Sequence, residues 1–226
     1  MRLLIDDAHI ELIDKAYEFH PIDGVTTNPT ILSKIGGNPF DTLKEIRKVI
    51  ADDELHVQAI SRKAEDIVEE AKYIFDTLGE NTYVKIPAIP EGFKAMEILN
   101  FATEILFTAT AIYTPMQAYI AAKCGAAYVA PYVNRIDNMG FNGLEITKQI
   151  QNIFENNELE TEVLAASFKN SQQVLELCEY GIAAATISPD LLTAFTKNSA
   201  IDEAVETFIS DFESFAGKGK TMRDFK

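Results

Sequence analysis

The feature that most constrains the fold is a regular alternation of short β-type runs with longer segments of helical period. Parallel strands covered by helices are nearly continuous in apolar residues, and these runs fit that pattern. Eight of them occur, at residues 3–6, 24–27, 55–60, 83–87, 105–110, 127–133, 162–167 and 184–188. Eight strands, each followed by a helix, predict an α/β fold built as a single (β/α)8 TIM barrel. A doubly wound open sheet is the alternative, which the count of eight and the compact length disfavour.

The helical segments carry recognisable ends and faces. Thr114-Pro115-Met116-Gln117 has the residues of a capping box, and Gly125 fits the position just past the end of that helix. We find no Pro/Ser linker, so residues 1–226 are expected to form one domain with a C-terminal helix and tail over about 201–226. That helix carries an apolar stripe of Val205, Phe208, Ile209, Phe212 and Phe215. Two interpretations of the stripe stay open: it packs on its own barrel, or it also contacts a neighbouring subunit.

Charge and composition exclude several classes of protein. The chain has 20 Lys+Arg against 35 Asp+Glu, a net charge of −15, which argues against binding to nucleic acid or to an anionic membrane. Two cysteines, no signal peptide and no long apolar run favour a reducing cytoplasm. The only histidines are His9, His20 and His56, and none are at metal-ligand spacing, so no metal and no cofactor is expected.

Lys85 is out of place in an apolar strand. Successive strand residues face opposite sides, and Val84 and Ile86 suit the side that faces the helices, so Lys85 is expected to point toward the barrel axis. An ammonium inside a barrel is costly unless it is paired or deprotonated. Two interpretations stay open: a structural Lys paired with a carboxylate, or a neutral amine able to form Schiff bases.

Other strands bring further polar residues to the end of the barrel where Lys85 is expected. The carboxyl ends of barrel strands form the active site in enzymes of this fold, so a ring of polar groups there predicts a catalytic site. The ring consists of Asp6, Asn28, Gln58, Thr110, Tyr132 and Ser167.

Arg135, Ser167 and Lys169 follow the sixth and seventh runs. Their donors suit a phosphate group, and barrels commonly bind phosphate near the later strands. The alternative is a surface ion pair between Arg135 and Asp137.

Four segments in this order resemble one family. GVTTNPTIL (24–32), YVKIP (83–87), YVAPYVNRID (128–137) and LAASFK (164–169) resemble the small transaldolase family and, within it, the fructose-6-phosphate aldolase subfamily. The resemblance implies a (β/α)8 class I aldolase that uses a Lys Schiff base without metal and assembles as a homodecamer of two pentameric rings. By resemblance, Lys85 is the Schiff-base residue, Asp6 contacts substrate hydroxyls, Asn28 holds substrate, and phosphate binds Arg135, Ser167 and Lys169.

Two positions separate the subfamilies. By resemblance, transaldolases have a Glu on the third strand and a Phe after the sixth, whereas this chain has Gln58 and Tyr132, with Thr110 as a third group holding a water. We therefore expect cleavage of fructose 6-phosphate to dihydroxyacetone and glyceraldehyde 3-phosphate. The alternative is a transaldolase of the pentose phosphate pathway, and a third hypothesis is a barrel that binds sugar phosphate without catalysis. Asp7, in place of the usual Thr, and the 105–110 run depart from the pattern.

Overall fold

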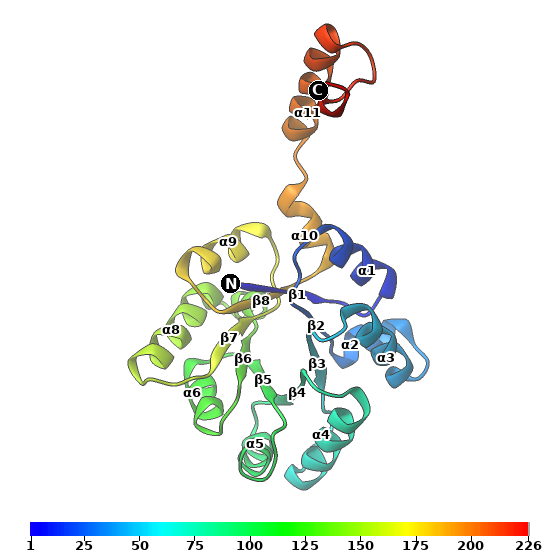
Figure 1. Ribbon diagram of the computed structural model, residues 1–226. Helices are drawn as coiled ribbons and strands as arrows, with labels where there is room; N and C mark the ends of the chain where they lie inside the picture. The colour runs from blue at the N-terminus through cyan, green and yellow to red at the C-terminus, as the bar shows by residue number, and fades with distance from the viewer. Residues whose placement is uncertain (226) are drawn as a thin grey trace. The chain divides into compact units, whose positions relative to one another are not determined.

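The computed structural model describes residues 1–225, and it confirms the barrel. Eight parallel strands pair in sequence order, and β8 pairs with β1 to close the sheet (Figure 1). The strands are β1 (Arg2–Asp6), β2 (Gly24–Thr26), β3 (Glu54–Gln58), β4 (Thr82–Pro87), β5 (Phe107–Ile112), β6 (Tyr128–Pro131), β7 (Glu162–Ala165) and β8 (Ala184–Ile187).

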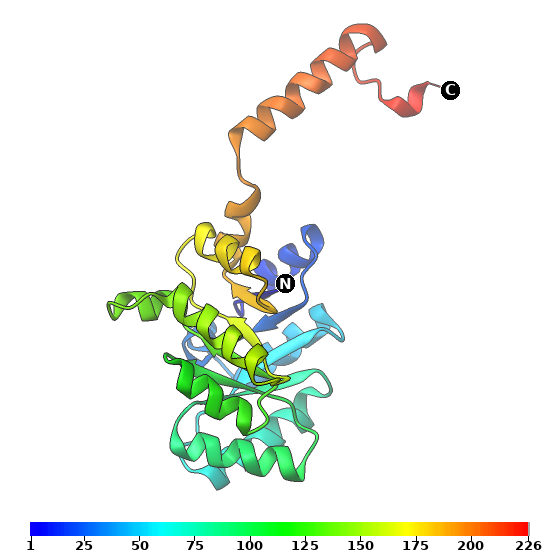
Figure 2. The ribbon, with the colours of Figure 1, turned by 90° about the vertical axis from the view of Figure 1, so that its left-hand side faces the viewer.

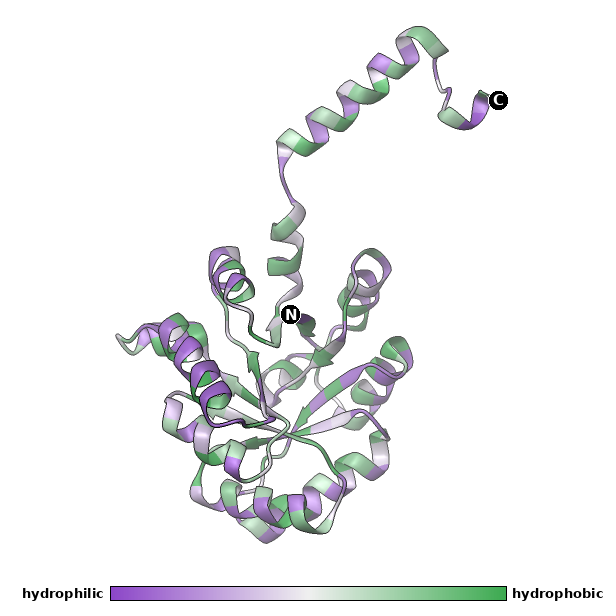
Figure 3. Cartoon of the chain, turned by 60° about the vertical axis from the view of Figure 1, so that its left-hand side comes forward, coloured by the Kyte–Doolittle hydropathy of each residue, from purple (hydrophilic) through white to green (hydrophobic). Residues whose placement is uncertain are grey.

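Helices connect the strands around the outside of this barrel, as Figure 1 and the side view of Figure 2 show. They are α1 (Ile10–Phe19), α2 (Pro29–Ile35), α3 (Pro39–Ile50), α4 (Ala64–Leu78), α5 (Pro90–Ala102), α6 (Pro115–Lys123), α7 (Val133–Asn138), α8 (Gly143–Asn156) and α9 (Ser171–Tyr180). A further helix, α10 (Pro189–Thr196), follows the last strand. Hydrophilic and hydrophobic patches alternate along them in Figure 3, as expected for helices with one buried face.

The predicted helix ends are confirmed at α6. Thr114 accepts a hydrogen bond from the Gln117 backbone, Gln117 reciprocates, and Gly125 has a φ of +87° just past the helix. Because only glycine adopts such a φ without a steric penalty, Gly125 lets the chain turn into β6.

Strand residues alternate between two environments. Val84 and Ile86 are fully buried in the apolar layer under the helices, whereas Leu4 and Tyr128 belong to a separate cluster inside the barrel. Gly24 faces that interior, and a Cβ added there would lie 2.4 Å from the Glu54 carbonyl oxygen. The sequence therefore needs glycine where β2 and β3 approach each other.

Strand bounds differ from the sequence prediction at the carboxyl ends. The fifth strand extends to Ile112, with a register shift against β6 and a φ of +56° at Ala111. Tyr132 and Ser167 lie just beyond β6 and β7, with Tyr132 held by a single bridge to Ala166. The short runs of this sequence do not mark such irregular ends, because a bulge depends on pairing with a neighbouring strand.

Residues from Thr193 onward form a second compact unit. Within it, α11 runs over Ser199–Ala216 and a 3-10 turn over Met222–Asp224, and no α11 residue is buried. Phe212 packs edge-on against Phe215 and Phe225. The side chains of Val205, Phe208, Ile209 and Phe215 are exposed, so the role of this stripe stays a prediction.

Candidate active site

Lys85 projects from β4 into the barrel, as the strand alternation predicts. Its side chain is 6% exposed, and Nζ donates a hydrogen bond of 2.8 Å to the backbone carbonyl of Thr27. No ion pair within residues 1–225 involves Lys85. The amine is held by a carbonyl, so the geometry disfavours a structural ion pair.

The surroundings of Lys85 favour its neutral form. Burial lowers the pKa of Lys85 below its ordinary value of 10.5; the negative charge of Asp6 opposes this and the positive charge of Arg135 adds to it. A lower pKa increases the fraction of neutral amine, which is the nucleophile toward a carbonyl carbon.

Asp6 ends β1 and shares the barrel interior with Lys85. It accepts a hydrogen bond of 2.7 Å from the Thr26 hydroxyl, which also contacts the Thr186 hydroxyl at 2.7 Å. Burial raises the pKa of Asp6 above its ordinary value of 3.8, and the charge of Lys85 and the Thr26 hydrogen bond only partly offset it. A carboxyl whose charge is poorly compensated is suited to taking a proton from a bound hydroxyl.

Gln58, Thr110 and Tyr132 lie near or just beyond the carboxyl ends of β3, β5 and β6. Gln58 is the register partner of Lys85 on β3, so the two side chains lie next to each other on the inner face. On the other side of β4, the Thr110 hydroxyl on β5 and the Tyr132 hydroxyl just beyond β6 are 2.8 Å apart. The Tyr132 ring packs edge-on against Tyr113, which fixes the direction of its hydroxyl.

The predicted phosphate residues lie beyond β6 and β7, with Arg135 in α7 and with Ser167 and Lys169 between β7 and α9. The Arg135 guanidinium lies 4.5 Å from the centre of the Tyr132 ring, and its charge acts on both Lys85 and Asp6. Ser167 has a φ of +62°, a backbone conformation that costs a non-glycine residue energy and is common at binding sites.

The predicted alternative, a pair between Arg135 and Asp137, is absent from residues 1–225. The Asp137 carboxylate accepts hydrogen bonds from the Gly143 backbone and the Gln173 amide, both at 2.7 Å. Arg135 is exposed, and no hydrogen bond within residues 1–225 uses its guanidinium. Lys169 is also exposed, and only its backbone is held, by Gln173.

Asn28, predicted to hold substrate, caps a helix in the structure. Its side-chain oxygen accepts a hydrogen bond of 3.0 Å from the Ile31 backbone and so caps α2, which begins with Pro29. The cap uses the oxygen, and no hydrogen bond within residues 1–225 uses the amide NH2 group, so substrate binding by Asn28 stays a prediction.

Asp7, the departure noted in the sequence, holds the turn that precedes α1. Its carboxylate accepts from the backbone of Ala8 and His9, and lies 2.7 Å from His9 Nδ1. It also borders a cavity of about 300 Å³ that includes Asp6, Lys34 and Ser188.

Sequence reasoning missed several groups that hold the site. The Thr27 carbonyl accepts from Lys85, the Thr26 hydroxyl donates to Asp6, and the Thr186 hydroxyl contacts that of Thr26. The two threonines before Asn28 were the only local signal for these contacts. Sequence reasoning also missed a second group of polar side chains inside the barrel near Lys85. They are Glu54, His56 and Thr108.

Within residues 1–225, no group of three His, Cys, Asp or Glu side chains could hold a metal ion. Over the same residues, no helix is both long and apolar enough to span a bilayer.

Comparisons with known proteins agree with this arrangement. The family described as Transaldolase/Fructose-6-phosphate aldolase matches residues 3–223. Probable transaldolases of Hydrogenobaculum sp. and Aquifex aeolicus are each 37% identical, over 96% of this chain and 99% of the relative. A solved mandelate oxidase with an FMN adduct aligns with a TM-score of 0.58 over 95% of this chain and 74% of that chain, at 15% identity, which shows the fold alone.

Proposed function

The chain belongs to the transaldolase/fructose-6-phosphate aldolase family, and from that premise we propose that Lys85 forms a Schiff base with a ketose phosphate and that the enzyme moves a dihydroxyacetone unit. The observation that carries the proposal is the buried Lys85 amine, which has a carbonyl as its only hydrogen-bond partner within residues 1–225. A barrel that only binds sugar phosphate would have no need to bury an amine in this way.

The first steps assign a role to each side chain. The Lys85 amine attacks the C2 ketone and, with loss of water, gives an iminium, which accepts the electron pair when the C3–C4 bond breaks. Asp6 or Tyr132 takes the proton of the C4 hydroxyl. Glyceraldehyde 3-phosphate then leaves Arg135 and Ser167, and a three-carbon enamine stays on Lys85.

Transfer of that enamine to an acceptor aldose phosphate is the first candidate outcome. The names of relatives at about 37% identity support it, since each is called a probable transaldolase. The incoming aldehyde forms the new C3–C4 bond, and hydrolysis of the iminium releases the longer ketose phosphate.

Release of free dihydroxyacetone is the second candidate, and two side chains favour it. Gln58 beside Lys85 is a neutral amide that cannot donate a catalytic proton. The Tyr132 hydroxyl, 2.8 Å from that of Thr110, is then left to protonate the enamine, directly or through a water.

Borohydride trapping tests the shared intermediate. Reduction in the presence of fructose 6-phosphate should add mass to the peptide that contains Lys85 and leave the exposed Lys94 unmodified. Trapping at another lysine contradicts the proposal. Activity should survive excess EDTA, and loss that zinc restores contradicts a metal-free mechanism.

A second assay separates the two outcomes. An aldolase releases dihydroxyacetone from fructose 6-phosphate with no acceptor present, whereas a transaldolase needs an acceptor aldose phosphate. The homodecamer and the cytoplasmic location stay predictions, which sedimentation and cell fractionation test.

A further inference from the structure

A hydrogen-bonded chain of side chains crosses the barrel interior below Lys85. His56 is fully buried; its Nε2 lies 3.2 Å from a Glu54 oxygen and its Nδ1 lies 2.9 Å from the Thr108 hydroxyl. The imidazole stacks on the Tyr83 ring, with centroids 4.7 Å apart and planes 11° apart. The mechanism proposed above uses none of these groups.

The hydrogen bonds that join Thr108, His56 and Glu54 all donate in one direction, toward Glu54. Glu54 also accepts from the Tyr128 hydroxyl at 2.9 Å and pairs with Arg2 at 3.4 Å. Burial acts to raise the pKa of Glu54, but the hydrogen bonds from His56 and Tyr128 and the charge of Arg2 hold it below its ordinary value of 4.5. Glu54 is therefore an ionised acceptor, so Nε2 of His56 donates to it and Nδ1 accepts the Thr108 proton.

Strand register puts the far end of this chain beside Lys85. Lys85 on β4 has Gln58 as its register partner on β3 and Thr108 as its register partner on β5. Neighbouring strands lie about 4.8 Å apart, so the Thr108 side chain flanks the Lys85 stem on the inner face. His56 and Thr108 thus join the two strands that border β4, directly under the amine.

We propose that the Glu54–His56–Thr108 chain is a positioning device for Lys85, in which His56 fixes the Thr108 hydroxyl against the lysine stem and so aims the amine at the substrate carbonyl. The inference rests on the proposed function. Apolar side chains would fill this space without the penalty of burying polar groups, so stability alone does not explain the chain.

The burial of His56 also keeps a second cation away from Lys85. Glu54, Arg2, Tyr83, Tyr128 and Lys85 face His56. Burial lowers the pKa of His56 below its ordinary value of 6.5, against the pull of Glu54, so the imidazole is neutral at pH 7. Lys85 then faces only the charges of Asp6 and Arg135.

Matched substitutions test the device. Thr108→Val keeps the shape and removes the hydroxyl, and should slow borohydride trapping of fructose 6-phosphate about ten- to a hundredfold, as small misplacements of reacting groups do. The control is Thr147→Val, which removes a buried hydroxyl that bonds the Gly143 carbonyl in α8, and it should trap at the wild-type rate.

Two His56 variants locate the effect in one hydrogen bond. His56→Asn places an oxygen near the Nδ1 position and should retain most of the trapping rate, whereas His56→Gln reaches toward Glu54, abandons Thr108, and should lose as much as Thr108→Val. If Thr108→Val does not fold, the two His56 variants still test the positioning role. Equal losses in both His56 variants overturn the proposal, as does a wild-type trapping rate in folded Thr108→Val or His56→Gln.

A readout without sugar separates this inference from the proposed function. Reductive methylation of Lys85 with formaldehyde, followed over pH by peptide mass spectrometry, should show its midpoint at lower pH in Thr108→Val, since less polar surroundings disfavour the ammonium. A shifted midpoint with no sugar adduct in the wild type keeps the positioning and rejects the proposed function. Sugar trapping in the wild type supports the proposed function. If the methylation midpoint and the trapping rate are then unchanged in the variants, the positioning role is rejected.

Discussion

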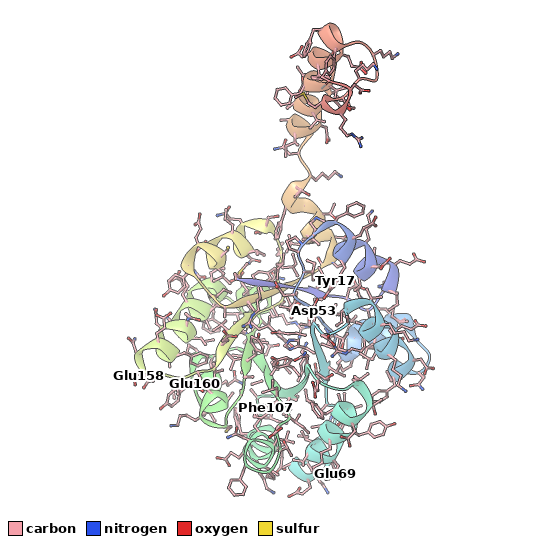
Figure 4. All side chains as sticks on the ribbon, viewed as in Figure 1. Tyr17, Asp53, Glu69, Phe107, Glu158 and Glu160 are labelled. Carbon is pink, nitrogen blue, oxygen red and sulfur yellow. The ribbon has the colours of Figure 1, made fainter. Side chains whose placement is uncertain are left out.

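The two ends of the barrel interior both bury polar side chains, yet they treat them differently. At the carboxyl end, Asp6 accepts one side-chain hydrogen bond, Lys85 donates to one carbonyl, and no hydrogen bond within residues 1–225 engages the Gln58 side chain. At the amino end, Glu54 has three side-chain partners, among them Arg2. Figure 4 labels Glu158 and Glu160, which border a hollow of about 510 Å³ that also includes Arg2.

The two partly buried carboxyl groups, Asp6 and Glu54, differ in the direction of their pKa shifts. Burial acts to raise both; it prevails at Asp6, whose pKa is raised, whereas donors around Glu54 leave its pKa lowered. A carboxylate whose hydrogen-bonding capacity is filled by protein donors, such as Glu54, stabilises the fold. A carboxylate with few donors, such as Asp6, stays available to a substrate but lowers stability.

The largest effect is expected from removing the amine. Lys85→Met should abolish turnover and sugar trapping, because no Schiff base forms, while the free energy of unfolding stays equal or rises, because an unpaired buried amine is replaced by an apolar chain. Turnover and thermal denaturation measure both. Residual turnover at the wild-type rate would remove Lys85 from the mechanism.

A matched pair of tyrosines compares the ends directly. Tyr132→Phe should lower turnover by on the order of 10²–10⁴, the range for loss of an acid or base, while trapping at Lys85 continues. Tyr128→Phe removes the donor to Glu54 and should instead lower the free energy of unfolding by about 1.5–3 kcal/mol. Normal turnover with fructose 6-phosphate in Tyr132→Phe would contradict the role of this hydroxyl and weaken the aldolase outcome.

The next prediction concerns phosphate binding by Arg135 at the carboxyl end of the barrel. Arg135→Ala should weaken use of glyceraldehyde 3-phosphate about ten- to a hundredfold, as loss of a charged hydrogen bond does, and change unphosphorylated aldehydes little. Steady-state kinetics with both aldehyde classes give the comparison. Equal losses with the two classes would place the phosphate elsewhere.

The smallest expected effects are changes in the free energy of unfolding as a function of pH. Glu54→Gln and Asp6→Asn should change it in opposite directions. Glu54→Gln should lower the free energy of unfolding at pH 7 by about 1–3 kcal/mol. The stabilisation by Glu54 is present above its ordinary pKa of 4.5 and is lost as the pH falls through its lower folded value, so the difference from wild type should shrink in acid.

Asp6→Asn should stabilise the protein at pH 7. The folded pKa of Asp6 lies above 3.8, so its favourable contribution is complete below pH 3.8 and disappears as the pH rises through the folded value. The gain from Asp6→Asn should therefore vanish in acid. Chemical denaturation across the pH range measures both variants, and shifts of the same sign would break the contrast between the two ends.

The sequence by itself determined the barrel and the inward direction of Lys85, whereas the ring of polar residues around Lys85 stays a prediction. These follow from local patterns: runs of strand length, alternation of faces, and capping residues such as Thr114. The family motifs also lie in short contiguous stretches. Strand bounds were less accurate, since the bulge at Ala111 arises from pairing with β6.

Only the tertiary structure decided which inward side chains meet. His56 and Thr108 are separated by a whole strand and 52 positions, and the Thr27 carbonyl reaches Lys85 across 58. Likewise, Asp137 binds Gln173 and leaves Arg135 unpaired within residues 1–225. Local patterns fix the face of each residue, but its height in the barrel is set by the stagger of closed strands, which is a property of the whole sheet.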